Sequence, residues 1–240
     1  MGTKIANFLN SNKQNGKKLL AILIDPDKAS PQHIKNVLRP ENVAKIDVIF
    51  IGGSVLTSGN IHDAIKTVKG TCDLPCIIFP GSPDQISHEA DAILLLSLIS
   101  GRNPDMLIGK HVEAALRLKQ SKLEILPTGY ILIDGGAPTT VSYISGTTPI
   151  PSNKPGLAAM TALAGEQLGF HVIYMDAGSG AKKAIPAQMI SAVREHTSQP
   201  IVVGGGIRTV EGIHAAWNAG ADVVVIGNKL EEDADFLLNL

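Results

Sequence analysis

The chain alternates between short, almost continuous apolar runs and longer stretches in which apolar residues recur every three to four positions. Eight apolar runs are bounded by Gly, Pro or Asp, at residues 19–25, 47–53, 75–81, 92–98, 130–136, 171–178, 200–206 and 222–228. Runs without polar alternation are typical of strands in a parallel sheet that is covered on both faces. Stretches with helical periodicity lie between them, at 106–120, 156–169, 187–197 and 209–220.

Eight such strands that alternate with helices in 240 residues predict a (β/α)8 barrel, the TIM-barrel class of α/β folds. A doubly wound open sheet is the alternative. No linker, low-complexity segment or block of charge divides the chain, so we expect a single domain over residues 1–240.

The connection between the third and fourth runs is unusually short. Its ten residues, SPDQISHEAD at 82–91, are near the minimum for a parallel crossover that includes a helix. We therefore expect the third helix of the outer ring to be missing or vestigial. The gap would expose apolar surface in a side groove suited to a ligand, whereas a short turn packed flat on the barrel is the alternative.

Composition excludes several functional classes. A net charge of -1 gives no general attraction to nucleic acid or anionic lipid. The first eighteen residues, MGTKIANFLNSNKQNGKK, lack the apolar region of a signal peptide. No apolar stretch is long enough to span a membrane, so we expect a cytoplasmic protein that binds neither nucleic acid nor a bilayer stably.

Three successive strands end in glycine-rich turns, in the sequences YMDAGSG (174–180), VVGGGIR (202–208) and VVVIGN (223–228). The carboxyl ends of barrel strands form the active-site face, and the turns after the last two strands commonly bind phosphate. Consecutive glycines let backbone N–H groups approach an anion closely. The pattern favours one shared phosphate site over three unrelated tight turns.

Two oxygen-bearing side chains, Asp25 and Ser54, end the first and second strands on the opposite side of this face. Two protein oxygens, with water and substrate phosphates, are a usual way to hold Mg²⁺. Both residue types also cap helices, which is the alternative. Asp27 and Lys28 are typical of a solvated turn pair, although Lys28 could neutralise phosphate charge.

The motifs ILIDPDK, IFIGGS, YMDAGSG, VVGGGIR and VVIGN, in this order, resemble the geranylgeranylglyceryl phosphate synthase family. Members of this family are prenyltransferases that make the first ether bond of archaeal-type lipids. The resemblance runs from the first strand to the eighth, and the long loop 135–153 is similar to that of the family's second group. It implies a (β/α)8 barrel with a disrupted third helix, Mg²⁺ as cofactor, and sn-glycerol 1-phosphate and a polyprenyl diphosphate, here geranylgeranyl diphosphate, as substrates.

The resemblance also implies roles for individual residues. Asp25 and Ser54 bind the Mg²⁺ that holds the diphosphate, and Lys28 assists with diphosphate charge. The glycerol phosphate binds Tyr174, Met175, Asp176, Ala177, Gly178, Ser179, Gly180, Gly205, Gly206, Gly227 and Asn228. The side groove takes the prenyl tail, and the protein is expected to form a homo-oligomer, a dimer or a multiple of dimers.

Asp176 is expected to act as the general base on the C3 hydroxyl of glycerol phosphate. The family's motif usually carries Glu at this position. The aspartate carboxylate is one methylene shorter, so it must sit closer to the substrate or act through water.

Two other functions fit the same residues. A phosphosugar isomerase or lyase of the histidine or tryptophan pathway type would share the phosphate turns, with Asp25 and Asp134 as acid and base. A non-catalytic module that binds a phosphorylated ligand, such as a flavin phosphate, would leave Asp176 without a role.

Overall fold

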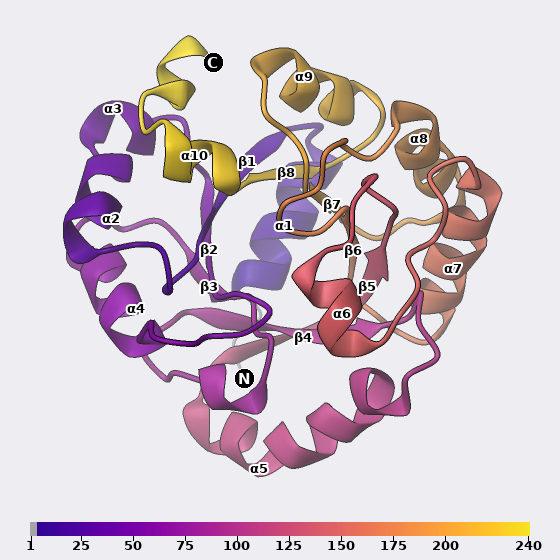
Figure 1. Cartoon of the computed structure of the whole chain (residues 1–240), viewed down its shortest axis with the longest axis horizontal. Coiled ribbons are helices and arrows are strands. Elements are labelled where there is room, and N and C mark those ends of the chain that lie inside the picture. The colour runs from indigo at the N-terminus through magenta and orange to yellow at the C-terminus, as the bar shows by residue number, and fades with distance from the viewer. Residues whose placement is uncertain (1–3) are drawn as a thin grey trace.

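The computed structural model describes residues 4–240, which form a closed barrel of eight parallel strands in chain order (Figure 1). The strands are β1 (Leu19–Ile24), β2 (Val48–Ile51), β3 (Cys76–Ile78), β4 (Ala92–Leu98), β5 (Glu124–Leu132), β6 (Val172–Asp176), β7 (Ile201–Gly204) and β8 (Val223–Ile226). Strand β1 pairs with β8 to close the barrel, with Leu19 opposite Val223. The predicted (β/α)8 barrel is confirmed, and the open-sheet alternative is wrong.

Helices surround the barrel in Figure 1. The α-helices of the described residues are α1 (Lys4–Gln14), which lies in the middle of this view, α2 (Pro31–Val37), α3 (Pro40–Val43), α4 (Ile61–Lys69), α5 (Lys110–Ser121), α6 (Thr140–Ser145), α7 (Pro155–Gln167), α8 (Ala187–His196), α9 (Val210–Asn218) and α10 (Asn228–Glu232). The shorter helical turns are η1 (Pro83–Gln85), η2 (Asp105–Gly109) and η3 (Phe236–Asn239). Within residues 4–240, every helix is too short or too polar to cross a bilayer.

Side chains on the two faces of the strands form two separate hydrophobic clusters. The inner cluster fills the barrel and includes Phe50, Leu94 and Tyr174. The outer cluster lies between the strands and the surrounding helices, and includes Ile49 and Met175. Because most strands are buried on both faces, they appear in the sequence as nearly continuous apolar runs.

Helix α1 closes the amino end of the barrel, a feature that the sequence analysis missed. Its residues Ile5 and Leu9 belong to the inner cluster. The Glu124 carboxylate, at the start of β5, accepts hydrogen bonds from the N–H groups of Ile5 and Ala6 at 2.7 and 2.8 Å. These N–H groups have no partner within the helix, so the carboxylate caps the first turn. The polar composition of this segment hid its narrow apolar side.

The third helix of the outer ring is replaced by the single 3-10 turn η1, as the short connection predicted. Strand β3 nevertheless pairs with β4 in parallel, with Ile78 opposite Ile93. The outer face of β4 therefore lacks a full covering helix on the β3 side.

Two segments differ from the expected boundaries. Strand β5 begins at Glu124, whereas the apolar run was expected to begin at residue 130. Pro127, Thr128 and Gly129 interrupt the apolar pattern and concealed the first part of the strand. The long loop 135–153 contains helix α6, whose capping box joins Thr139 and Ser142.

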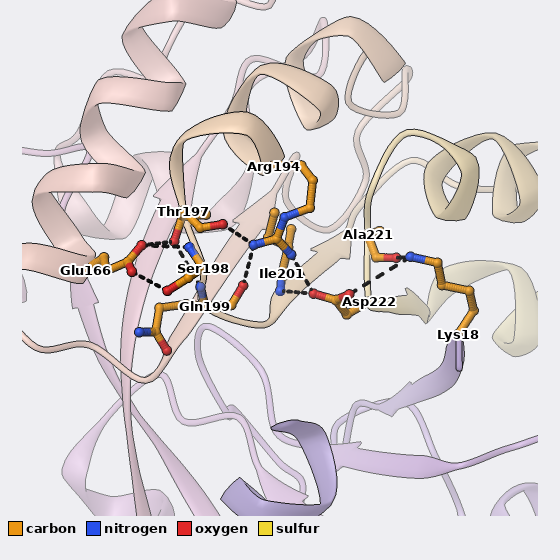
Figure 2. A network of polar contacts seen from close by, with 9 residues as sticks. All are labelled: Lys18, Glu166, Arg194, Thr197, Ser198, Gln199, Ile201, Ala221 and Asp222. Atoms are coloured by element: carbon orange, nitrogen blue, oxygen red, sulfur yellow. Dashed lines mark hydrogen bonds and ion pairs between the residues drawn. The ribbon is translucent and has the colours of Figure 1, made fainter. Parts of the chain in front are cut away.

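A polar network joins the amino ends of β7 and β8 to the outer helices (Figure 2). The Asp222 carboxylate, before β8, accepts a hydrogen bond from the N–H of Ile201 at 2.9 Å and one from Nη1 of Arg194 at 2.9 Å. Lys18, before β1, donates to the carbonyl of Ala221 at 2.7 Å. Asp222 and its neighbour Ala221 thus connect α8 with the amino ends of β7, β8 and β1.

The network continues from Arg194 to helix α7 (Figure 2). Arg194 also donates to the carbonyl oxygens of Thr197 and Gln199. The Glu166 carboxylate on α7 accepts hydrogen bonds from the Thr197 hydroxyl at 2.6 Å and the Ser198 N–H at 2.8 Å. The turn between α8 and β7 is therefore held from both sides.

Asp222→Ala should lower the free energy of unfolding by about 2–3 kcal/mol, because it leaves the Ile201 N–H without an acceptor and the Arg194 guanidinium without its carboxylate partner. Urea denaturation measures the loss. Glu113→Ala is the control, because Glu113 pairs with Lys110 on the exposed face of α5 and such pairs contribute little. Equal losses in the two variants would contradict the structural role of Asp222.

Candidate active site

A polar pocket lies at the carboxyl ends of the strands, the face on which barrel enzymes carry their active sites. It encloses about 1060 Å³, its open mouth included, which is ample for small-molecule binding. The residues predicted from the sequence that line it are Asp25, Lys28, Ser54, Tyr174, Asp176, Ser179, Gly180, Gly205, Gly206, Gly227 and Asn228. The barrel thus brings together residues that are up to two hundred positions apart in the sequence.

Three residues of the predicted run do not line this pocket. The side chains of Met175 and Ala177 are buried in the outer cluster, because alternate residues of a strand face opposite sides. Gly178 helps to orient the Asp176 side chain through its backbone, since its N–H donates to Oδ1 of Asp176 at 2.7 Å. The side chains of Met175 and Ala177 therefore face away from any ligand in the pocket.

The carboxylate of Asp176 is held from two sides. The Tyr130 hydroxyl donates to its Oδ2 at 2.6 Å, and the Gly178 N–H donates to its Oδ1. Burial raises the pKa of Asp176 above its ordinary value, although both hydrogen bonds act in the opposite direction. A buried carboxylate with a raised pKa at the wall of a pocket is a candidate for proton transfer.

Tyr130 is a pocket residue that the sequence analysis missed. The residue is 5% exposed, and its ring packs against Phe79 and Tyr174, with centroid distances of 6.0 and 5.6 Å. Burial raises the pKa of Tyr130 well above its ordinary value, so the hydroxyl stays protonated and donates. The sequence offered no clear signal for it, because the fifth strand was expected to begin at residue 130, which places Tyr130 at the wrong end of the strand.

The glycine turns after β6 and β7 pack too closely for side chains. Gly205 and Gly206 have φ of 82° and 70°, a conformation that favours glycine. A Cβ on Gly205 would lie 2.7 Å from both Oδ1 of Asp176 and the backbone N of Ala177. The turn after β7 therefore presses directly against the carboxylate.

Backbone donors gather around this turn. Within residues 4–240, the N–H groups of Ser179, Gly180, Gly205 and Gly206 donate to no other group of the chain. The Ser179 hydroxyl donates to Oδ1 of Asn228 at 3.3 Å and so connects the turns after β6 and β8. The three turns face one pocket and offer donors to an anion, which is the arrangement that a shared phosphate site requires.

The opposite wall carries Asp25, Lys28 and Ser54. Nζ of Lys28 lies 3.6 Å from Oδ2 of Asp25 and 3.1 Å from Oε2 of Glu231. Neither Asp25 nor Ser54 caps a helix, because Ser30 caps α2 and Asn60 caps α4. The capping alternative is therefore wrong for both residues.

In residues 4–240, no three His, Cys, Asp or Glu side chains gather closely enough to hold a metal ion. Asp25 and Ser54 nevertheless line the same pocket, and both offer the hard oxygen atoms that Mg²⁺ prefers. The two residues fit a magnesium ion that takes its other ligands from water and a substrate phosphate.

Asp27 lies in a turn, as expected, but it also has a structural role that the sequence analysis did not predict. Its carboxylate accepts hydrogen bonds from the N–H groups of Thr57, Ser58 and Gly59 at 2.7, 3.1 and 2.6 Å, and from the Thr57 hydroxyl at 2.9 Å. Burial alone raises the pKa of Asp27, but these bonds outweigh it and lower the pKa to about 2. Asp27 thus fixes residues 57–59 of the loop after β2, a loop that also contains Ser54.

A second, apolar groove of about 920 Å³, its open mouth included, lies between β4 and α5. Its walls include Ile86, Ile93, Leu95, Ala114 and Leu118. The groove occupies the place of the missing third helix, so the alternative of a turn packed flat on the barrel is wrong. It meets the polar pocket at shared residues, Gly53, Ser54, Phe79, Tyr130 and Val141.

Comparison with known proteins identifies the relationship. The model of the PcrB family matches residues 13–239. The chain belongs to the PcrB family. It is 51% identical over 237 residues to a geranylgeranylglyceryl phosphate synthase of Chitinophaga pinensis, covering 99% of this chain and 94% of the relative. A protein of the same name from Spirosoma linguale is 50% identical, covering 97% and 94%. The family resemblance of the motifs is confirmed, and placement in the second group stays a prediction.

Solved structures agree with this relationship. The PcrB-family chain superposes on (S)-3-O-geranylgeranylglyceryl phosphate synthase from Thermoplasma acidophilum, in complex with sn-glycerol-1-phosphate, with a TM-score of 0.90 and 33% identity. The match covers 97% of this chain and 95% of that one. The tryptophan synthase α-subunit of Pyrococcus furiosus matches at 13% identity with a TM-score of 0.56, a likeness of fold alone.

Asp27→Ala should speed hydrogen exchange at the amides of residues 57–59 by about tenfold or more, because these amides lose a charged acceptor. Asp73→Ala, in an exposed turn before β3, is the control. The pKa of Asp27 is lowered, so in the wild-type protein the protection is complete above the ordinary value of 3.8 and is lost as the pH falls through about 2. Unchanged exchange in Asp27→Ala would contradict the assigned role.

Proposed function

We propose that the protein is a geranylgeranylglyceryl phosphate synthase, which joins the C3 hydroxyl of sn-glycerol 1-phosphate to C1 of geranylgeranyl diphosphate. One observation carries the proposal: an apolar groove meets a pocket rich in backbone donors, and the buried Asp176 carboxylate stands on the wall of that pocket. A substrate with a long apolar chain and a charged head needs both surfaces. The names of the relatives from Chitinophaga pinensis and Spirosoma linguale support the same activity.

The glycerol phosphate binds in the pocket between the glycine turns and Asp176. Its phosphate takes hydrogen bonds from the free N–H groups of the turns after β6 and β7, and the turn after β8 completes the site. Because Gly205 packs against the Asp176 carboxylate, a phosphate held by this turn places the rest of a three-carbon substrate beside the carboxylate.

The diphosphate of the prenyl donor binds at the opposite wall. Asp25 and Ser54 would hold Mg²⁺ there, and the ion would supply positive charge to the leaving diphosphate. Lys28 brings a further positive charge to the same wall, where Glu231 and Asp25 hold its ammonium group. The prenyl tail extends from this wall into the apolar groove.

In the reaction, the C3 oxygen of glycerol phosphate forms a bond to C1 of the donor while the bond from C1 to the diphosphate oxygen breaks. The diphosphate leaves with the bonding electron pair, and the hydroxyl proton passes to the Asp176 carboxylate, which acts as general base. Asp176 is buried and already oriented, so the proton acceptor is in place before the substrates arrive.

The rival phosphosugar isomerase needs Asp25 and Asp134 as an acid–base pair in one pocket. Asp134 is exposed, does not line the polar pocket, and accepts a hydrogen bond from the Gly136 N–H at 2.8 Å. A phosphosugar also has no long apolar chain that would occupy the apolar groove. A non-catalytic binding module leaves the held carboxylate of Asp176 without a role. The homo-oligomeric state and the cytoplasmic location stay predictions.

Incubation of the purified protein with radiolabelled sn-glycerol 1-phosphate, Mg²⁺ and a series of prenyl diphosphates tests the proposal. We expect a labelled product that partitions into organic solvent, with the greatest yield from the geranylgeranyl donor. Stoichiometric binding of either substrate without product would contradict the proposed reaction and favour a binding module.

Asp176→Asn should lower kcat by about 10²–10⁴-fold, because it removes the base and nearly preserves its shape. Steady-state kinetics should show little change in the KM of the prenyl donor. Asp176→Glu keeps a carboxylate and should remain active. If Asp176→Asn keeps kcat within a few-fold of wild type, another group or the diphosphate itself accepts the proton.

Asp25→Asn should weaken Mg²⁺-dependent turnover sharply and leave the fold intact, because strand ends at this face serve function more than stability. Activity is measured against Mg²⁺ concentration, and circular dichroism checks the fold. Near-normal activity of Asp25→Asn at low Mg²⁺ would remove Asp25 from the proposed metal site.

A further inference from the structure

Tyr130 lies where the two binding surfaces meet. It is one of the few residues that line both the apolar groove and the polar pocket. Its hydroxyl donates to Oδ2 of Asp176 at 2.6 Å, across the neighbouring strands β5 and β6. The ring faces the groove that we assign to the prenyl chain, while the hydroxyl contacts the proposed base.

The ring of Tyr130 has little freedom. It packs against Tyr174 and Phe79, which stack on each other with centroids 5.0 Å apart and an interplanar angle of 10°. Phe50 closes the same cluster against Tyr174. A ring fixed in this way sets the position of its hydroxyl, and the hydroxyl in turn sets the rotation of the short aspartate side chain.

The hydrogen bonds from Tyr130 and Gly178 leave the Asp176 carboxylate able to accept a proton from a substrate. An ionised carboxylate has about four acceptor sites, and the chain uses one on each oxygen, from Tyr130 and from Gly178. The remaining sites can accept the hydroxyl proton of a substrate. Tyr130 itself stays protonated in its buried position and is not a competing base.

We propose that Tyr130 is a positioning residue, whose hydroxyl holds the Asp176 carboxylate at the junction where the hydroxyl of glycerol phosphate meets C1 of the prenyl donor. This inference rests on the proposed function and deepens it. Tyr130 acts through Asp176. Because its ring lines the groove and its hydroxyl holds the carboxylate, Tyr130 fixes the position of the base relative to the groove.

The charged groups around Asp176 should not change when the Tyr130 hydroxyl is removed, so a pH profile can test its role. The titratable groups in contact with it or nearest to it are Tyr130 and Tyr174, and β7 presents only glycine backbone at this point. The charged residues on the rest of the pocket wall are Asp25, Lys28, Arg208, Lys229 and Glu231. The three cations among them pair with Glu231, Glu232 and Asp233, so loss of the Tyr130 hydroxyl leaves these pairs in place.

Tyr130→Phe removes the hydroxyl and keeps the ring. The hydrogen bond favours the ionised form of Asp176, so its loss raises the pKa of the base. The acid limb of the kcat/KM profile should therefore move to higher pH by about one unit. At neutral pH kcat should fall by about tenfold or more, while the KM values of both substrates change by less than about threefold.

Thr128→Val is the matched control. Thr128 lies on the same strand and is fully buried, and its hydroxyl donates to the carbonyl of Leu126. This variant should lose stability comparable to that of Tyr130→Phe and keep the wild-type pH profile. In an Asp176→Asn background, Tyr130→Phe should cause no further loss of kcat, because the two residues act as one unit.

Three results would overturn the inference: an acid limb that stays in place in Tyr130→Phe, a rise in the KM of the prenyl donor as the main effect, or additive losses in the double variant. If Tyr130→Phe does not fold, 2,3-difluorotyrosine at position 130 replaces it. Its more acidic hydroxyl donates more strongly, so the limb should move to lower pH, and an unchanged limb would again overturn the inference. Absence of prenyl transfer in the wild-type protein would instead reject the proposed function.

Discussion

The site depends on the close packing of the turns after β6 and β7 around one buried carboxylate. Gly205 has no room for a side chain because Asp176 and the backbone of Ala177 lie against it. The same turn supplies to the pocket N–H groups that have no partner within residues 4–240. The proposed function joins phosphate binding and proton transfer at this point, since the backbone that would receive the anion also fixes the distance from the anion to the proposed base.

The second constraint is the missing third helix. An outer helix at this position would cover the outer face of β4, and its replacement by η1 leaves an apolar groove instead. The groove reaches the polar pocket because Phe79 and Tyr130 line both. A barrel that binds only small phosphorylated substrates has no need of this surface, so the groove is the main structural feature that separates a prenyltransferase from the rival functions.

Much of the architecture follows from local sequence patterns. Eight apolar runs give eight strands, and the short segment 82–91 gives the vestigial helix. Helix α1 was missed because only one narrow side of it is apolar, and the start of β5 was missed because Pro127 and Gly129 break its pattern. Local patterns cannot show that a carboxylate more than a hundred residues away caps the first turn of this helix.

Site residues that belong to glycine turns or strand ends could be predicted from the sequence. Site residues whose role depends on contacts with distant segments could not. The positions of Asp25, Ser54 and Ser179 follow from the rule that strand ends converge. The role of Asp27 could not be read from its neighbours, because its partners lie about thirty residues further along the chain. Tyr130 shows the same limit, since only the pairing of β5 with β6 brings its hydroxyl to Asp176.

The central claim is that one pocket binds the phosphate and presents the substrate hydroxyl to Asp176. A crystal structure of the protein with sn-glycerol 1-phosphate tests it most directly. The account predicts phosphate oxygens within hydrogen-bond distance of the N–H groups of Gly205 and Gly206, and the C3 hydroxyl about 2.6–3.2 Å from the Asp176 carboxylate. A phosphate bound away from these turns, or a C3 hydroxyl that points away from Asp176, would contradict it.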